Sequence, residues 1–202
     1  MTEMRKRRRL VLYVLAGLAL AALGWVAYTR IDEWFETRGE EFAEVIPGVL
    51  FRSDQPHGRL RAMLQRTGIR TVVDLRLRNE DPAIFEKTAA RCKAVGVDFM
   101  NIPVSAVVPD DLQVAAFLDV MRFGRKPVLV HCEHGKSRTG IMVAAYRVVV
   151  EGWSAEKAVE EMFADGYRSD PNHAVRLALL QRLQRDRQAW LDRTSSTTST
   201  QG

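Results

Sequence analysis

Residues 127–146, PVLVHCEHGKSRTGIMVAAY, decide how the rest of the chain folds. The first four of them, residues 127–130, form a short apolar run, which predicts a buried strand. Residues 141–146 are apolar again and predict the start of a buried helix. The polar loop between these runs holds Cys132 and Arg138, with five residues separating the two. This arrangement places a cysteine at the end of a strand and an arginine at the N-terminus of a helix.

A loop of this kind is suited to bind a phosphoryl group. Its backbone N–H groups can converge on one anion, and the helix end adds a partial positive charge. The same field stabilises a thiolate, so we expect Cys132 to be the nucleophile. Arg138 offers a planar fork for two phosphoryl oxygens, and Thr139 places a hydroxyl near the sulfur. The predicted phosphate-binding residues are Glu133, His134, Gly135, Lys136, Ser137 and Arg138.

The pattern H-C-x-x-G-K-x-R-T-G at residues 131–140 resembles the catalytic loop of the cysteine-dependent protein tyrosine phosphatase superfamily. It is most like the compact dual-specificity branch of bacterial and plant-fungal type. Residues 52–56, RSDQP, are similar to the R-S-x-Q-P stretch of small members of that branch. The resemblance covers roughly residues 42–192. It implies hydrolysis of phosphate monoesters through a cysteinyl-phosphate intermediate, with no metal and no other cofactor.

The resemblance also implies a general acid on a loop upstream, between a strand and a helix. The loop in that place is residues 103–111, PVSAVVPDD. Related enzymes have an acid nearer to Ser105, where this sequence has none. Asp110 is therefore our first candidate and Asp111 the second. An acidic residue after a proline is also a favourable helix cap. The alternatives to both candidates are an acid that the pattern does not identify and the absence of a strong acid.

Strands alternate with helices over the rest of the chain, which predicts a three-layer α/β domain with a central, mostly parallel sheet. This is also the fold that the resemblance implies. The predicted strands are residues 49–52, 69–75, 97–102 and 127–130. The predicted helices are residues 58–65, 82–95, 109–123, 138–150, 155–164 and 171–192.

Length, charge and cysteine content limit the class of protein. The 202 residues are enough for one domain with a full core. Most of the net charge of +5 belongs to five basic residues at positions 5–9, so the domain is close to neutral and nucleic-acid binding is not expected. Cys92 and Cys132 are the two cysteines, which is neither a disulfide framework nor a zinc site.

The N-terminal part predicts a single membrane-spanning helix. Residues 10–28 carry no charge, and a helix of that length spans roughly 28 Å. Because basic residues precede this segment and acidic ones follow it, we expect a cytoplasmic N-terminus and an extracytoplasmic catalytic domain, periplasmic in a bacterium. A cleaved signal peptide or a mitochondrial presequence are the alternatives. The predicted order is a basic tail 1–9, an anchor 10–28, a connector 29–41, a phosphatase domain 42–193 and a disordered tail 194–202.

The substrate stays open at this stage. Lys136 resembles the lysine of relatives that act on inositol phosphates or phosphoinositides, and His134 adds charge when protonated, whereas Glu133 opposes both. The expected partner is thus a phosphorylated protein or, alternatively, an anionic phospholipid or inositol phosphate. Arsenate reductases and sulfur-transfer enzymes share the loop pattern. A non-enzymatic alternative is a membrane-tethered pseudophosphatase that only binds phosphate.

Overall fold

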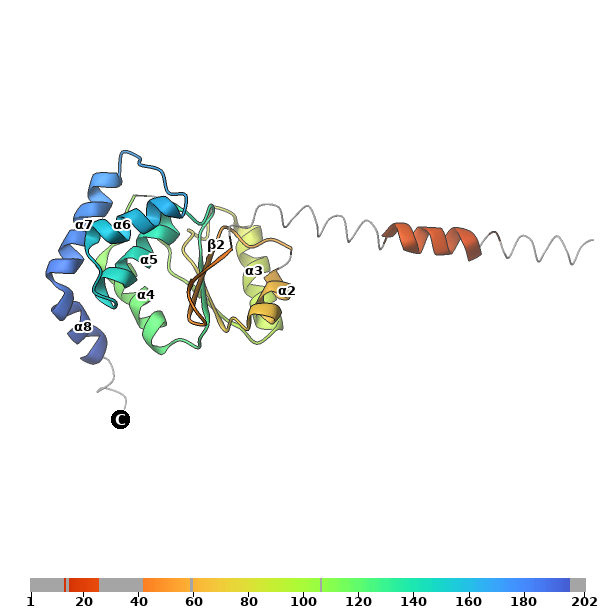
Figure 1. Cartoon of the computed structure of the whole chain (residues 1–202). Coiled ribbons are helices and arrows are strands. Elements are labelled where there is room, and N and C mark those ends of the chain that lie inside the picture. Colours follow the sequence, from red (N-terminus) through yellow and green to blue (C-terminus); the bar gives the residue numbers. More distant parts are fainter. Residues whose placement is uncertain (1–12, 14, 26–41, 59, 106, 197–202) are drawn as a thin grey trace, which may run out of the picture. The chain divides into compact units, whose positions relative to one another are not determined.

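The computed structural model describes residues 13, 15–25, 42–58, 60–105 and 107–196 (Figure 1). The chain divides into two units, Met1–Gly39 and Glu40–Gly202. In the first unit the described residues are helical, and their large apolar side chains are exposed. No helix of the described residues is long and apolar enough to cross a membrane. The anchor predicted for residues 10–28 lies partly outside the described residues and stays a prediction, as do the basic tail and the connector.

The second unit is built on a five-stranded sheet with the order β1-β2-β5-β3-β4. The edge strand β1 is antiparallel to β2, and all other neighbours are parallel. The strands are β1 (Ala43–Ile46), β2 (Leu50–Ser53), β3 (Thr71–Asp74), β4 (Asp98–Asn101) and β5 (Val128–His131). This mixed sheet confirms the predicted α/β fold class.

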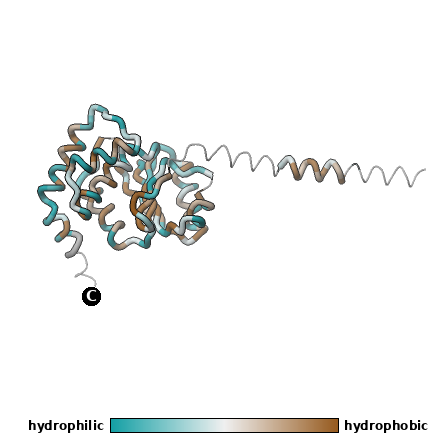
Figure 2. Tube along the Cα trace, in the orientation of Figure 1, coloured by the Kyte–Doolittle hydropathy of each residue, from teal (hydrophilic) through white to brown (hydrophobic). Residues whose placement is uncertain are grey.

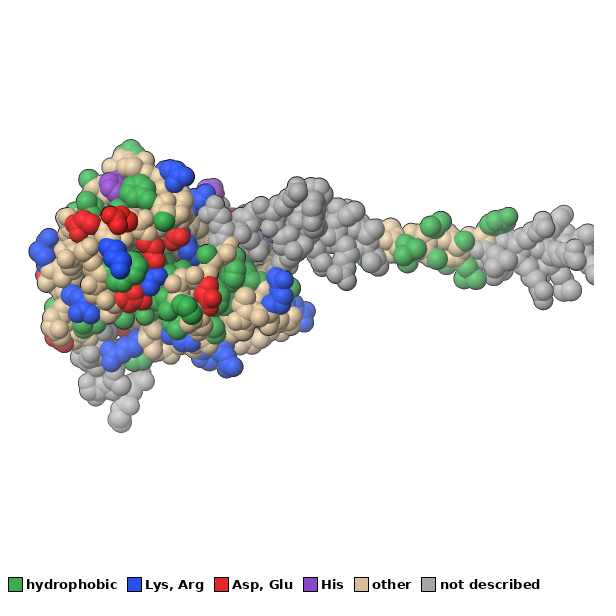
Figure 3. Space-filling view, viewed as in Figure 1, with side chains coloured by type: hydrophobic (Ala, Val, Ile, Leu, Met, Phe, Trp, Pro, Cys, Tyr) green, Lys and Arg blue, Asp and Glu red, His purple; other side chains and the backbone are tan. Residues whose placement is uncertain are grey.

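Helices cover both faces of the sheet, which gives three layers (Figure 1). One face carries α2 (Leu60–Thr67) and α3 (Pro82–Ala94). The helices of the other face are α4 (Asp111–Phe123), α5 (Ser137–Val149), α6 (Ala155–Ala164), α7 (His173–Arg185) and α8 (Arg187–Ser196). Apolar residues concentrate in the central strands and the helix faces that meet them (Figure 2). On the face seen in Figure 3, basic and acidic side chains are interspersed, as expected for a nearly neutral domain.

The central position of β5 follows from its sequence. All four of its residues are buried, which suits a parallel strand with helices on both sides. Leu129 belongs to the core beneath α2 and α3, whereas Val128 and Val130 belong to the core on the opposite face. This alternation is the period of two that a strand requires.

Three elements differ from the sequence-based expectation. β1 was not predicted, because it is a four-residue edge strand whose side chains are at most half-buried. The single helix predicted for residues 171–192 is two helices, and Asp186 ends the first of them. The break turns the chain so that Trp190 enters the core and Arg187 donates to the carbonyl of Val149 at the end of α5 (2.8 Å). α8 continues to Ser196, into the segment predicted as a disordered tail from residue 194.

Parallel pairing brings three strands to one edge of the sheet. The last residue of β5, His131, pairs in register with Ser53 of β2 and with Asp74 of β3. The segments that follow these three residues therefore emerge side by side, at the carboxyl edge where parallel sheets usually bind ligands.

Candidate active site

The loop from Cys132 to Arg138 joins β5 to α5 at this carboxyl edge. Cys132 is only 3% exposed, and it still lines a pocket with a volume of about 660 Å³. Because α5 begins at Ser137, its N-terminal N–H groups lie at the end of the same loop. The structure thus brings the predicted nucleophile, the predicted arginine and a helix N-terminus together.

Gly135 is the tightest point of this loop. Its φ of +67° lies in the left-handed region, and a Cβ atom there would come within 2.8 Å of the backbone of Ser53 and Asp54. The loop therefore rests directly on the segment that follows β2. Gln55 strengthens this contact, because its N–H donates to the carbonyl of Glu133 (3.0 Å) and its side chain accepts from Arg76 (2.5 Å). The R-S-x-Q-P stretch is thus a support of the phosphate loop.

Arg138 is held by a carboxylate that the sequence analysis missed. Its Nη1 and Nη2 donate to Oε1 and Oε2 of Glu80, at 2.5 and 3.0 Å. Burial alone would raise the pKa of Glu80, but hydrogen bonds from Arg138 and the Leu77 N–H, with the charge of Arg138, lower it to about 2. The signal in the sequence was the position of Glu80 shortly after β3, at the ligand-binding edge.

His131 is fully buried behind the loop. Its Nδ1 lies 3.4 Å from the carbonyl oxygen of Cys132 and 3.9 Å from Oδ1 of Asp74. Burial lowers the pKa of His131, although Asp74 raises it, so the ring is neutral at pH 7. Within the described residues, the His131 Nε2 and the Thr139 hydroxyl are buried without a hydrogen-bond partner. The role predicted for Thr139 beside the sulfur stays a prediction.

The segment between α6 and α7 forms the second wall of the pocket, which the sequence did not reveal. It contributes four lining residues, namely Gly166, Tyr167, Arg168 and Asp170. Tyr167 is buried, and Arg176 holds the wall in place by donating to the Tyr167 hydroxyl (2.9 Å) and to the carboxylate of Asp170 (2.7 Å). Of the predicted phosphate-binding residues, those lining the pocket are Glu133, His134, Lys136, Ser137 and Arg138.

The two candidates for the general acid do not line this pocket. Asp110 is the N-cap of α4 and forms a capping box with Gln113, in which the side chain of each residue accepts a hydrogen bond from the backbone N–H of the other. Asp111 pairs with Arg182 of α7 (2.5 Å), whose hydrogen bond lowers the pKa of the Asp111 carboxyl. Both carboxylates thus have structural roles, and their assignment as acid stays a hypothesis.

Cys92, the other cysteine, lies in the core beneath α2 and α3. Burial raises the pKa of its thiol to about 12, so Cys92 is a packing residue and not a second reactive thiol. Within the described part of the chain, no group of three or more His, Cys, Asp or Glu side chains is placed to hold a metal ion.

Residues 27–176 match the model of a family described as DSP-PTPase phosphatase fused to NAD+ kinase. The chain belongs to this family. It is similar to the dual specificity protein phosphatase TpbA of Pseudomonas aeruginosa, with 35% identity over 120 residues, which are 58% of this chain and 51% of TpbA. The crystal structure of TpbA superposes with a TM-score of 0.60 at 30% identity, covering 75% of this chain and 91% of that one.

Of two further relatives, one matches over a shorter stretch of sequence and the other has a lower sequence identity. The mouse phosphatidylglycerophosphatase and protein-tyrosine phosphatase 1 is 41% identical over 64 residues, 32% of each protein. The core catalytic domain of the PP-IP phosphatase SIW14 from S. cerevisiae shares the fold, with a TM-score of 0.62 at 20% identity, covering 79% of this chain and 93% of that one. The chain spans about half the length, or less, of the curated relatives it matches.

Proposed function

We propose that this protein is a cysteine-dependent phosphatase that hydrolyses phosphate monoesters. The observation that supports this most is the joint placement of Cys132, Arg138 and the N-terminus of α5 at one pocket. A thiol there meets backbone N–H groups and a guanidinium, which together match the three outer oxygens of a phosphoryl group. Membership of the phosphatase family points to the same reaction.

In the proposed reaction, the Cys132 thiolate attacks phosphorus, and the bond from phosphorus to the leaving oxygen breaks. The leaving oxygen takes a proton from an acid or from solvent. Water then attacks the phosphocysteine, the S–P bond breaks, and inorganic phosphate and the thiolate are released. Arg138 balances the charge that develops on the oxygens, and the Thr139 hydroxyl eases departure of the thiolate. His131 orients the loop and does not act as a base.

The first test replaces the nucleophile. Cys132→Ser should abolish turnover of an aryl phosphate while keeping phosphate binding, because only the thiolate is lost. Cys92→Ala is the matched control, since it removes the other thiol from a core away from the pocket, and it should keep most of the activity. Steady-state rates and phosphate inhibition measure both effects. Retention of substantial turnover by Cys132→Ser would rule out the mechanism.

The volume of the pocket and the cations that line it support a second candidate class of substrate. Its volume of about 660 Å³ exceeds the needs of one phosphoryl group, and Lys136 and Arg168 line it from the two opposite walls. Two cations beside Arg138 favour a substrate with several anionic groups, such as an inositol phosphate or a phospholipid headgroup. Glu133 lines the same pocket and favours the alternative, a phosphotyrosine protein.

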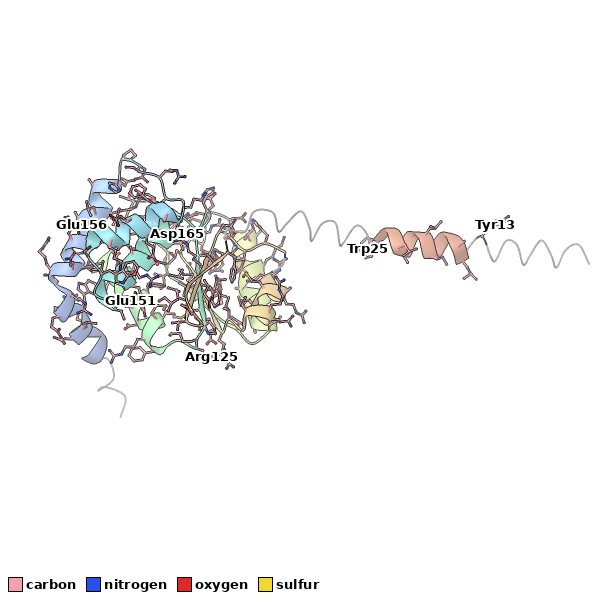
Figure 4. The ribbon with its side chains drawn as sticks, viewed as in Figure 1. Tyr13, Trp25, Arg125, Glu151, Glu156 and Asp165 are labelled. Carbon is pink, nitrogen blue, oxygen red and sulfur yellow. The ribbon has the colours of Figure 1, made fainter. Side chains whose placement is uncertain are left out.

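The substrate classes differ in their dependence on these cations. Lys136→Ala and Arg168→Ala should each raise KM for an inositol polyphosphate by about tenfold, because one charge-assisted hydrogen bond is lost. The same variants should leave KM for a phosphotyrosine peptide nearly unchanged. Arg125→Ala is the control, because Arg125 precedes β5 and so lies at the other edge of the sheet (Figure 4). A fast peptide reaction, with no reaction of the polyphosphate, would make the protein a phosphotyrosine phosphatase.

We also propose that residues 10–28 anchor the catalytic domain to a membrane, with the domain on the extracytoplasmic side. The support is the uncharged length of this segment and the excess of basic residues before it. An anchored domain would be presented with substrates at or near the lipid surface.

A further inference from the structure

Arg52 is a buried guanidinium that the proposed reaction does not use. It is 4% exposed and lies in β2 on the same face as Leu50, since side chains alternate along a strand. That face carries α6, whose C-cap residue is Asp165. The Nη1 of Arg52 pairs with the carboxylate of Asp165 (labelled in Figure 4), and its Nη2 donates to the carbonyl of Gly135 (2.5 Å). Arg52 therefore connects the sheet, α6 and the phosphate loop.

The contact with Gly135 fixes the direction of a peptide unit. A trans peptide is planar, so its C=O and N–H groups point in opposite directions. Because the Gly135 carbonyl points toward Arg52, the N–H of Lys136 points away from Arg52, and Lys136 itself lines the pocket. The N–H of Gln55 holds the Glu133 carbonyl in the same manner, which orients the N–H of His134.

This peptide unit needs an external partner to stay in place. Glycine populates both signs of φ with similar ease, so the backbone at Gly135 has little preference of its own for the φ of +67°. A hydrogen bond from a charged donor is about twice as strong as a neutral one, and burial shields it from water. Asp165 balances the charge of Arg52 and fixes its other end, so that the guanidinium stays directed at the loop.

We propose that Arg52 is a positioning residue of the phosphate site, and that Asp165 holds it in position. Arg52 orients the Gly135–Lys136 peptide so that its N–H donates to the bound phosphoryl group. It acts through the loop and does not touch the reacting atoms. The proposal rests on the proposed function, because it requires that the loop binds phosphate.

The test measures phosphate binding without turnover. Iodoacetamide alkylates the Cys132 thiol, and inorganic phosphate in the pocket protects it; peptide mass mapping distinguishes Cys132 from Cys92. The phosphate concentration that halves the alkylation rate reports affinity, whatever the absolute reactivity of the thiol. For Arg52→Met in the full chain this concentration should rise at least about tenfold, because one oriented donor is lost. Arg52→Lys should recover part of the affinity, since an ammonium can still donate to the Gly135 carbonyl.

A matched control separates positioning from stability. Arg147 of α5 is also buried, pairs with Glu151 and Glu161, and donates to the carbonyl of Val45 (3.0 Å), but it does not line the pocket. Arg147→Met should lower the melting temperature and leave phosphate protection unchanged. If Arg52→Met does not fold, the double variant Arg52→Met with Asp165→Asn avoids the unpaired carboxylate and takes its place.

The outcomes distinguish the two proposals. If phosphate protects Cys132 of the wild type from alkylation but the protein hydrolyses no phosphate ester, the proposed function is rejected. The positioning role of Arg52 is then still decided by the protection measured for its variants. A wild type that phosphate does not protect would reject both. Equal protection of wild type and the folded Arg52 variants would overturn the positioning role, as would an equal loss in Arg147→Met.

Discussion

At the scale of single residues, the pairing of Arg138 with Glu80 explains how the site keeps its arginine directed before substrate arrives. A guanidinium has five N–H donors, and a bidentate carboxylate occupies two of them. Glu80 takes one from each terminal nitrogen, which leaves donors for the oxygens of a phosphoryl group. Burial lowers the pKa of Arg138, but Glu80, Cys132 and Glu133 raise it above the ordinary value. The arginine is thus charged and oriented in advance.

The pKa of Glu80 predicts how this pair affects stability. In the folded protein that pKa is lowered from 4.5 to about 2, so the ionised carboxylate stabilises the fold. This contribution is complete above pH 4.5 and is lost as the pH falls from there toward 2. Urea unfolding of wild type and Glu80→Gln should therefore differ most near neutral pH and converge in acid. A difference in unfolding free energy between wild type and Glu80→Gln that does not change with pH would contradict the lowered pKa of Glu80.

The sequence predicted the residues of the site that are close together in the chain. Cys132 and Arg138 lie on one short loop, so a local pattern was enough to pair them. Glu80 is 58 positions from Arg138, and only the pairing of β3 with β5 brings the two together. Arg52 is 83 positions from Gly135, and its contact with that residue depends on the pairing of β2 with β5. Long-range pairing of this kind leaves no periodic signal in a single sequence.

At the scale of elements, the start of α4 bears on the missing general acid. The Asp110 carboxylate accepts from the Gln113 N–H (2.8 Å), while the Gln113 side chain accepts from the Asp110 N–H (2.9 Å). This capping box satisfies backbone donors that the helix itself leaves open. Aspartate is a favoured N-cap, and the acidic Asp111 in the first turn suits the positive end of the helix dipole.

Two substitutions separate capping from catalysis. Asp110→Asn keeps a good N-cap but cannot donate an acid proton, whereas Asp110→Ala loses both and should cost about 1 kcal/mol of stability. If Asp110 serves only as the N-cap, Asp110→Asn will match the wild type in melting temperature and in the ratio of rates on alkyl and aryl phosphates. A selective loss of alkyl phosphate hydrolysis in a fully stable Asp110→Asn variant would instead identify Asp110 as the acid.

Element boundaries were predictable where capping residues mark them. Ser154 caps α6, and the predicted range 155–164 is the observed one. In the same way, α3 starts at Pro82, directly after its N-cap Asp81. The break between α7 and α8 at Asp186 has no proline or glycine to announce it, because burial of Trp190 against the domain core decides it. Local propensity therefore predicts helix starts better than breaks imposed by packing.

At the scale of the whole molecule, the alternation of strands and helices predicted the layers but not the order of the strands. β5 is the last of the five strands along the chain, and it lies in the centre of the sheet, between β2 and β3. That order assembles the site, because it puts the support from β2 on one side of the phosphate loop and Glu80 after β3 on the other. A sheet with another order could have the same strand pattern and no pocket.

The proposed anchor gives the last prediction, which concerns the complete chain. If residues 10–28 span a membrane, the full-length protein should remain with membranes after carbonate washing, because peripheral contacts are removed and apolar insertion is not. A chain that starts at Glu40 should stay in the soluble fraction with an unchanged melting temperature, since Glu40–Gly202 forms its own compact unit.

The same full-length chain tests on which side of the membrane the catalytic domain lies. A periplasmic alkaline phosphatase reporter fused after Gly202 should be active, and replacing Arg7, Arg8 and Arg9 with acidic residues should reduce that activity, because the basic excess holds the N-terminus in the cytoplasm. Fluorescence from a reporter that folds only in the cytoplasm would refute the proposed orientation. Release of the full-length protein by carbonate would refute the anchor itself, while leaving the chemistry of the Cys132 pocket untouched.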